Sequence, residues 1–491
     1  MNFSKEKFSF IMELVLQGEF KNHMSTSEKE RRELEKLEKA EAFHGHQHYF
    51  SILIVVLSIV YIVDELASSV RGIVEVQTVR DLFNVIYPST DYDKASATLG
   101  FVTMAGYLSY LISPFYKSLA DKYGRRLFLI INTIGMGVGM LICILSKSIA
   151  LYVVGAVIMT FFTPNDVQVI YIMECAPKEH RAKLCSITKG LALISVSLLG
   201  LFVKLFVNDA VPSTWRNVFI IPIILAFVIG IVAIYLVRET PVFTQKRLQY
   251  LRASEEERAA AAAAEKQIEE EEKKNSVSVW DAFRFILGNK QTRAIAIVAL
   301  LMAFSTGYTG KYQPMLEAGK YNGVMSADAV NIILMFYPVI NGIFTMIGGF
   351  ITDALGRKKS ALILGLWAAL GLAVFAYGCI RPLNPYIVGL AYGISIAGLW
   401  SISDMIYFVI TSESTPTEMR ASVVGSMQLI GMFGMGFNMI YNNVVTMIAG
   451  STNLPIVLTI AYLPLMAISL VIMMLKVRET KGVDLENVQV D

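Results

Sequence analysis

Charged residues are scarce in this chain of 491 residues. Aspartate, glutamate, lysine and arginine make up 17% of it, whereas a soluble globular chain carries about a quarter. Apolar residues make up 55%, the mean hydropathy is +0.54, and the runs between the charged clusters reach about 20 residues, enough to cross a bilayer. The composition therefore excludes a soluble globular protein and predicts an all-α membrane protein. The net charge of +3 singles out no partner, and no nucleic-acid partner is expected.

Cysteine and histidine are also few, with four and five residues. The cysteines show neither metal-ligand spacing nor the pattern of a secreted disulfide protein. Alternating histidines such as His44, His46 and His48 can bind a metal, but this segment abuts the first apolar run, where polar residues collect, so no metal or other cofactor is expected. The sequence has no Gly-x-x-x-x-Gly-Lys loop and no nucleophile–base pattern, so an ATPase or another enzyme is not expected. No cleavable signal peptide is visible before Tyr49.

The apolar runs predict twelve membrane-spanning helices. They lie at about 50–70, 96–115, 127–145, 150–173, 185–207, 217–237, 293–312, 330–352, 360–380, 385–410, 422–446 and 454–476. Lysine and arginine cluster in both tails, in the central linker and in alternate loops, which predicts a protein of the cell membrane with both termini in the cytoplasm.

The spans divide the chain into two bundles of six helices. The expected parts are a cytoplasmic tail at 1–48, a bundle at 49–237, a cytoplasmic linker at 238–291, a second bundle at 292–476 and a tail at 477–491. Within the linker, the Ala/Glu/Lys-rich run 254–274 predicts a helix. The amphipathic segment 277–289 is expected to lie along the membrane surface.

The two halves repeat three charged motifs in the same order. "ADKYGRR" (120–126) matches "TDALGRKK" (352–359), "ECAPKEHRA" (174–182) matches "ESTPTEMRA" (413–421), and "VRET" occurs at 237–240 and 477–480. Each copy holds the corresponding place in its half, which predicts a pseudo-two-fold axis along the membrane normal and a central cavity.

These motifs also predict a gate. The aspartates would start helices, the glycines would allow tight turns, and the cations would pair with carboxylates and helix-end carbonyls of the other half. The expected gating residues are Asp121, Gly124, Arg125, Arg126, Glu174 and Arg181 in the first half, and Gly349, Asp353, Gly356, Arg357, Lys358, Glu413 and Arg420 in the second. The alternative is that these charges only set the topology.

The motifs resemble those of a known family. "DKYGRR" and the stretch from Gly349 to Lys359 resemble the loop signature of the major facilitator superfamily of secondary transporters, although Lys117 replaces a usual glycine. "ECAPKEHRA", "TWRNVF" and "VRET" resemble its branch of sugar porters and organic-ion transporters, and the resemblance extends over about residues 49–482. The resemblance implies alternating access by rocking of two bundles, often with proton coupling.

Three positions differ from the sugar-transporting members. "FSTGYTGKYQPM" stands where those members carry paired glutamines, and "WSISDMIYFVITSE" stands where they carry Gly-Pro-x-x-Trp. Lys189 is similar in position to a sugar-binding glutamine. A carboxylate-bearing solute is therefore favoured over a neutral sugar.

Several ionisable residues fall inside the predicted spans, where charge is costly and usually functional. Lys189 and Asp166 lie about 12 Å into the membrane from the turn between their helices. Lys189 is expected either to pair with Asp166 or to hold an anionic solute. In the second half Gln428 takes the place of Lys189, so Asp404 is expected to lack a cation.

Acidic residues in the spans are candidates for proton coupling. Asp64 resembles an acidic residue that some family members use to bind a proton, and Glu65 lies about 100° away on the same helix. With Asp166 and Asp404 they form the expected proton-coupling set. The alternative is structural pairing with Lys189, Arg71 or Lys311. Arg71 and Lys311 match in the repeat as cations at the outer mouth, which either attract anions or reach lipid headgroups.

Aromatic and amide side chains complete the expected cavity. The expected substrate-binding residues are Lys189, Gln428, Tyr61, Tyr308, Tyr312, Gln313, Tyr337, Asn341 and Trp400. Together these features predict a monomeric secondary transporter in the lipid bilayer that moves a small organic solute with protons. The alternatives are a sugar:proton symporter, an exporter of drugs or organic cations, and a membrane sensor that binds solute without transporting it.

Overall fold

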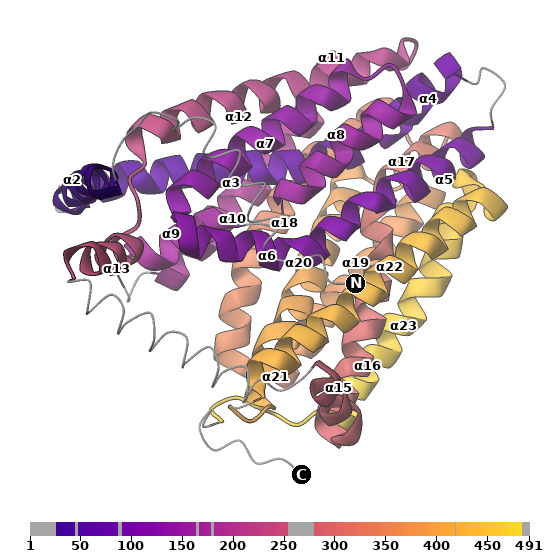
Figure 1. Ribbon diagram of the computed structural model, residues 1–491. Helices are drawn as coiled ribbons and strands as arrows, with labels where there is room; N and C mark the ends of the chain where they lie inside the picture. The colour runs from indigo at the N-terminus through magenta and orange to yellow at the C-terminus, as the bar shows by residue number, and fades with distance from the viewer. Residues whose placement is uncertain are drawn as a thin grey trace.

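The computed structural model describes residues 26–44, 48–86, 91–163, 166–177, 181–253, 279–417 and 419–483, which are almost entirely helical (Figure 1). The first half contains α3 (Tyr49–Ile73), α4 (Glu75–Ile86), α5 (Tyr92–Thr103), α6 (Leu108–Tyr123), α7 (Arg125–Leu145), α8 (Ile149–Phe162), α9 (Val167–Cys175), α10 (Arg181–Ser195), α11 (Ser197–Phe206) and α12 (Asn217–Leu236). The second half contains α16 (Lys290–Ser305), α17 (Tyr312–Tyr321), α18 (Ala327–Leu355), α19 (Arg357–Ile380), α20 (Pro385–Asp404), α21 (Thr411–Glu413), α22 (Arg420–Ala449) and α23 (Leu454–Lys476).

Eleven helical stretches in the described part of the chain are long and apolar enough to cross a membrane. The remaining expected span, at 96–115, falls on α5, the 3₁₀ turn η1 (Met104–Tyr107) and α6, which follow one another directly. The predicted all-α fold with two six-helix bundles is therefore confirmed. Most boundaries lie within a few residues of those predicted, because apolar length and flanking charge mark the ends of spans.

The bundles meet along two pairs of helices that the repeat relates to each other. α10 and α11 pack against α18, and α5 packs against α22. Figure 1 shows the bundles together near α4 and α17 and diverging toward α13 and α21. We call the end where Gly124 and Gly356 lie the glycine-turn end, and the opposite end, where Glu75 and Lys311 lie, the sealed end.

Packing between α10–α11 and α18 ends partway along the helices. A side chain at Gly200 would contact the backbone of Leu334, and one at Gly190 would contact Met346. Farther toward the glycine-turn end, Phe350 is 72% exposed. The helices therefore pack tightly toward the sealed end and separate toward the other.

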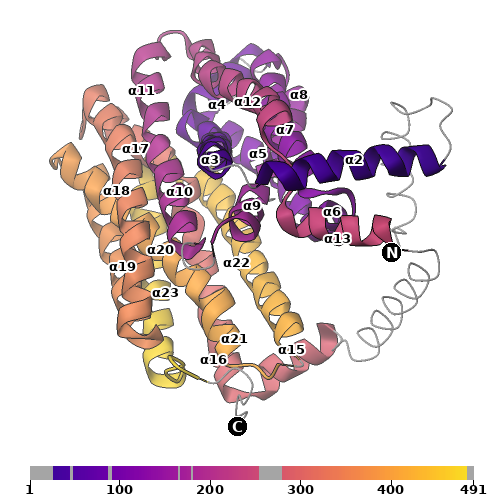
Figure 2. The same cartoon turned by 90° about the vertical axis from the view of Figure 1, so that its left-hand side faces the viewer.

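Besides α4 and α17, three described helices lie outside the spans. α2 (Thr26–His44) packs against α13 (Pro241–Arg252), as Figure 2 shows, and Arg247 pairs with Glu33 at 2.7 Å. α15 (Val279–Gly288) is amphipathic as predicted, with Trp280 exposed and Ile286 buried. The predicted helix at 254–274 and His46 lie outside the described residues.

Candidate functional site

The glycine-turn end carries the same carboxylate cap in both bundles. Gly124 and Gly356 have φ values of 100° and 86°, a conformation that glycine adopts without strain. The helix that follows each glycine directs its first N–H groups at a glutamate from a "VRET" motif. Glu239 accepts hydrogen bonds from the backbone nitrogens of Arg125 (2.9 Å) and Arg126 (3.1 Å).

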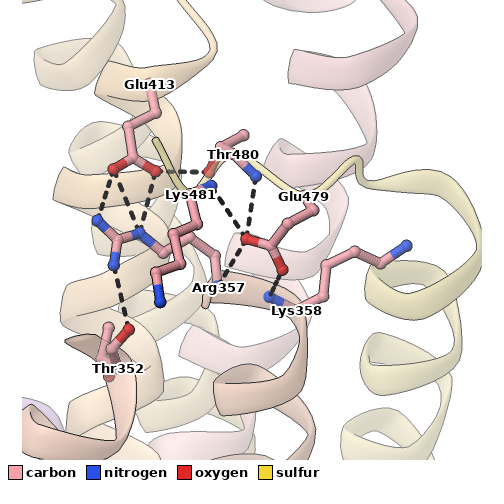
Figure 3. Close-up of polar contacts among 7 residues, drawn as sticks. All are labelled: Thr352, Arg357, Lys358, Glu413, Glu479, Thr480 and Lys481. Carbon is pink, nitrogen blue, oxygen red and sulfur yellow. Dashed lines mark hydrogen bonds and ion pairs between the residues drawn. The ribbon is translucent and has the colours of Figure 1, made fainter. Parts of the chain in front are cut away.

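The second cap has the same geometry (Figure 3). Glu479 accepts hydrogen bonds from the backbone nitrogens of Arg357 (2.7 Å) and Lys358 (3.0 Å). Burial raises the pKa of Glu239. Burial also acts to raise the pKa of Glu479, but the backbone hydrogen bonds outweigh it in this exposed cap, and the net pKa is lowered. Neither glutamate was predicted to be a cap, although the repeated "VRET" contains both.

Arginine–glutamate ion pairs complete this arrangement. Arg125 pairs with Glu174 at 3.1 Å, and Arg357 pairs with Glu413 at 2.7 Å. Thr480 donates a hydrogen bond to Glu413 at 2.5 Å (Figure 3). These contacts join helices of one bundle, so the expectation that such cations pair with the other half is wrong for this structure.

The remaining motif residues also act locally. Asp121 and Asp353 lie in the last turns of α6 and α18 rather than at helix starts, because the helix breaks at the following glycine. Arg181 donates to the carbonyl of Ala176 (3.0 Å), and Arg420 donates to that of Ser412 (3.1 Å). Arg126 donates to the carbonyl of Ile234. A side chain at Gly349 would meet open space.

Polar contacts between the bundles hold the sealed end together. Lys311 pairs with Glu75 at 2.7 Å, and its side chain is only 7% exposed. Gln313 accepts a hydrogen bond from the backbone nitrogen of Val76 at 2.9 Å and donates one to Gln77 at 3.2 Å. Lys311 thus forms a buried ion pair between the bundles and is not a free cation at the mouth. Gln313 belongs to the same seal.

Arg71, the other expected mouth cation, has no role in this seal. It donates a hydrogen bond to Thr160 at 3.0 Å, inside the first bundle. Two more contacts cross between the bundles at the sealed end. Lys320 pairs with Asp209 at 2.8 Å, and Asp93 accepts a hydrogen bond from the backbone nitrogen of Ser451 at 2.9 Å.

Midway between the two ends, Lys189 pairs with Asp404 across the bundles. Its Nζ lies 3.7 Å from Oδ2 of Asp404, and the side chains keep 41% and 55% of their exposure. Because the pair joins facing helices, this exposure lies between the bundles rather than toward lipid. The expectation that Asp404 lacks a cation is wrong, and no ion pair between Lys189 and Asp166 is found.

Three further acidic residues lie near this pair. Gln168 donates hydrogen bonds to Asp64 (3.1 Å) and Asp166 (3.3 Å) and so links two membrane-embedded carboxylates. Glu65 lies within electrostatic range of Lys189, and Asp166 lies within range of Lys117 and Lys189. Asp64 is buried and Glu65 half-buried. Gln168 was not predicted as a site residue, because it is uncharged, although it lies two residues after Asp166.

Asp166 and Asp404, which hold similar places in the two halves, both lie beside an irregularity in their helices. Asp166 has a φ of 30° at the break between α8 and α9, a left-handed conformation that aspartate tolerates better than most residues. Asp404 directly precedes a π-helical segment, Met405–Ile410; such segments often occur at functional sites. In the first half, the sequence "TPND" around Pro164 signalled the break.

The other expected substrate-binding residues fall into two groups. Tyr308 is fully buried and lies 2.6 Å from the hydroxyl of Ser395, and Tyr312 and Tyr337 pack against Tyr392 inside the second bundle. Tyr61 and Asn341 are also largely buried. Trp400 is exposed and Gln428 half-buried. The structure thus places much of the tyrosine set in bundle packing, while Lys189 and Asp404 stay accessible.

Comparisons with known proteins agree with this architecture. The mouse (Mus musculus) protein "Solute carrier family 2, facilitated glucose transporter member 12" is 26% identical over 266 residues, which are 51% of this chain and 42% of that protein. The human (Homo sapiens) counterpart is 26% identical over 251 residues, 49% of this chain and 40% of that protein. The matched segments thus span less than half of these relatives.

Solved structures match over most of the chain. A D-xylose-proton symporter superposes with a TM-score of 0.63 and 19% identity, covering 89% of this chain and 99% of that one. An inward-open xylose transporter XylE from E. coli gives 0.60 and 19%, covering 90% and 99%. The nucleoside transporter NupG gives 0.62 and 15%, covering 86% and 99%. The family model "Major Facilitator Superfamily" matches residues 50–439, and the chain belongs to that superfamily of membrane transporters.

Proposed function

We propose that this protein moves a small carboxylate-bearing organic solute across the cell membrane, coupled to protons, and that Lys189 holds the carboxylate. The accessible ion pair between Lys189 and Asp404 carries the proposal. An ammonium group between two bundles, held by a single long contact, is available to a competing anion. The neighbouring acids Asp64, Glu65 and Asp166 disfavour an uncompensated second anion, so exchange of partners at Lys189 requires a proton.

Partner exchange explains the coupling. When the solute carboxylate pairs with Lys189, Asp404 is left without a cation inside the membrane-spanning region. An unpaired charge there is costly, so a proton replaces the charge of the lysine. One solute anion therefore enters with at least one proton. Release of both restores the ion pair.

The same proposal assigns each end of the molecule to one side of the membrane. Lysine and arginine cluster at the glycine-turn end and in the linker, so this end and both termini face the cytoplasm. The sealed end then faces outward, and the structure represents a state open toward the cytoplasm. Rocking of the bundles would break the Glu75–Lys311 seal and bring the glycine-turn ends together.

A sugar:proton symporter is the second candidate. The xylose symporter and the glucose-transporter relatives favour it. Amide side chains such as Gln428 and Asn341 suit neutral hydroxyl groups. The two candidates differ in what they require of Lys189, because only a carboxylate needs its charge.

A ligand panel on the purified full-length protein separates these candidates. Small carboxylates, sugars and organic cations are screened by thermal stabilisation, and ligands that stabilise are then tested for flux in proteoliposomes. Ligand at 100 times its dissociation constant adds about 2.7 kcal/mol. We expect a carboxylate to stabilise the protein and Lys189→Gln to abolish this effect. The matched control is Lys204→Gln, an exposed lysine on the next helix segment.

Each other outcome has a definite meaning. Carboxylate binding and flux that survive Lys189→Gln contradict the proposed role of this lysine. Stabilisation by sugars alone favours the symporter of neutral sugars. Stabilisation by cations alone favours an exporter that uses the acidic residues. Binding without flux in an intact preparation favours a sensor.

A further inference from the structure

A cavity lies at the sealed end, away from the Lys189–Asp404 pair. It has a volume of about 450 Å³, within the range of small-molecule sites. The first bundle contributes Arg80 from α4 and Tyr92 from α5, and the second contributes Glu317 from α17 and Thr452 from the turn before α23. Val79, Phe83 and Pro314 supply apolar wall.

One side of this cavity is suited to an anion. The Arg80 guanidinium lies 5.9 Å from the ring centroid of Tyr92 and makes no ion pair with the described residues. The Tyr92 hydroxyl is buried and has no hydrogen-bond partner in the part of the chain that the structure describes. A buried hydroxyl without a partner is costly, and a ligand carboxylate paired with Arg80 would accept a hydrogen bond from it.

The other side carries negative charge. Glu317 is only 8% exposed, and its carboxylate lies 2.8 Å from Lys320, which it shares with Asp209. Asp93 also lines the cavity and directs one oxygen at the backbone of Ser451. The three carboxylates Glu317, Asp209 and Asp93 thus have one paired cation, Lys320, among the described residues, so an additional ammonium group is favoured beside them.

We propose that this cavity binds a small zwitterionic solute with an apolar body, such as an aromatic amino acid. The carboxylate pairs with Arg80 and Tyr92, the ammonium group lies near Glu317 and Asp93, and the apolar body packs against Phe83. This site is distinct from the transport site proposed above. Its assignment to the outer face of the membrane rests on the proposed orientation, but its ability to bind does not.

Binding here has a mechanical consequence. The walls come from both bundles, so a bound solute bridges α4 and α5 to α17 and stabilises the sealed end. Alternating access requires that end to open. The solute therefore inhibits transport without competing for the Lys189 site.

Phenylalanine is the probe, with phenylacetate and phenethylamine as singly charged controls. Thermal shift of the full-length protein should show stabilisation by phenylalanine and smaller shifts with either control at equal concentration. We expect Arg80→Gln to weaken phenylalanine binding at least tenfold, and Tyr92→Phe, which removes only the hydroxyl, to weaken it by a smaller factor. The matched control Arg381→Gln, an exposed arginine on another helix end, should leave it unchanged.

Two further variants test whether this cavity is separate from the transport site and whether it needs both bundles. Phenylalanine binding should survive Lys189→Gln, which separates this cavity from the transport site whether or not that site behaves as proposed. It should weaken in Lys311→Met, because the cavity needs both walls in contact. Wild-type affinity in both Arg80→Gln and Tyr92→Phe, or equal shifts with all three probes, would overturn the proposal. If Arg80→Gln does not fold, Tyr92→Phe alone decides the outcome.

Discussion

Lys189 on α10 and Asp404 on α20 form an ion pair of 3.7 Å that joins the two bundles in the middle of the membrane-spanning region. The pair lies where the bundles begin to separate. Among the ion pairs between described residues of the two bundles, it has the most exposed side chains. It is therefore the pair that a solute arriving between the bundles can reach most directly. The proposed mechanism requires this ion pair to form and break in each cycle, and its long distance and exposed position are compatible with that.

Asp404→Asn should uncouple the solute from protons. The amide leaves Lys189 free to hold a carboxylate, but it has no proton to gain or lose. We expect solute binding within a few-fold of wild type and uptake that no longer responds to a pH gradient. Uptake into proteoliposomes with and without an imposed gradient measures this.

The control for that experiment is Asp328→Asn, which removes an exposed carboxylate at the start of α18. It should keep gradient-driven uptake. Accumulation by Asp404→Asn that still follows the pH gradient would place the coupling proton on another acid, with Asp64 as the next candidate.

Lys311→Met should open the sealed end. Removing one partner of a buried ion pair leaves the other charge unpaired, at a cost of about 3–5 kcal/mol, and the variant can relieve this cost by exposing Glu75 to water. We expect maleimide labelling of Val79→Cys, a buried position beside this seal, to accelerate at least about tenfold, equivalent to about 1.4 kcal/mol.

Labelling of Tyr321→Cys serves as the reference, because Tyr321 is exposed at the same end. Its rate should be the same with and without Lys311→Met. Unchanged protection of the cysteine at position 79 would show that the ion pair does not hold the end closed.

Alanine should be poorly tolerated at both glycine turns. Both glycines combine a positive φ with an extended ψ (147° and 173°), a conformation nearly restricted to glycine that costs another residue about 1–3 kcal/mol. A Cβ would also lie 2.5 Å from Glu239 at position 124 and 3.1 Å from Glu479 at position 356. Thermal denaturation should therefore show a larger loss for Gly124→Ala than for Gly356→Ala. Gly436→Ala, where a Cβ meets open space in α22, should change stability little, and an equal loss there would refute the argument.

The two caps should respond to pH in opposite directions. The lowered pKa of Glu479 means that its stabilisation is present above the pKa of the unfolded chain and is lost as the pH falls through the folded value. Glu479→Gln should therefore cost about 1 kcal/mol at pH 7, and the difference from wild type should begin to close only below the ordinary glutamate pKa of about 4.3.

Glu239 has a raised pKa because it is buried, so its contribution is complete at low pH and is lost as the pH rises through the folded value. Wild type should gain stability relative to Glu239→Gln on acidification. Melting temperatures of the two variants between about pH 3 and 7.5 test both statements, because this range extends below the ordinary glutamate pKa. Parallel pH profiles would mean that the caps are equivalent.

Short motifs predicted local geometry well but partners poorly. The repeated "DKYGRR" and "DALGRK" motifs located the turns at Gly124 and Gly356, and "VRET" was recognised as a repeat. They did not show that Glu239 and Glu479 cap the following helices, because each glutamate is more than a hundred residues from its glycine. The same limit applies to Gln168, whose bridging of Asp64 and Asp166 depends on a helix break and on the packing of α3 beside α9.

The sequence alone determined the number and position of the membrane spans, the two-fold repeat and the family. These follow from apolar length, charge clustering and recurring motifs, which are local properties of the chain. Only the tertiary structure decided that Lys189 meets Asp404 rather than Asp166 and that Lys311 is sealed against Glu75. Spacing along a helix sets the depth of a residue, whereas its partner depends on how each helix is rotated and on how the bundles lean together.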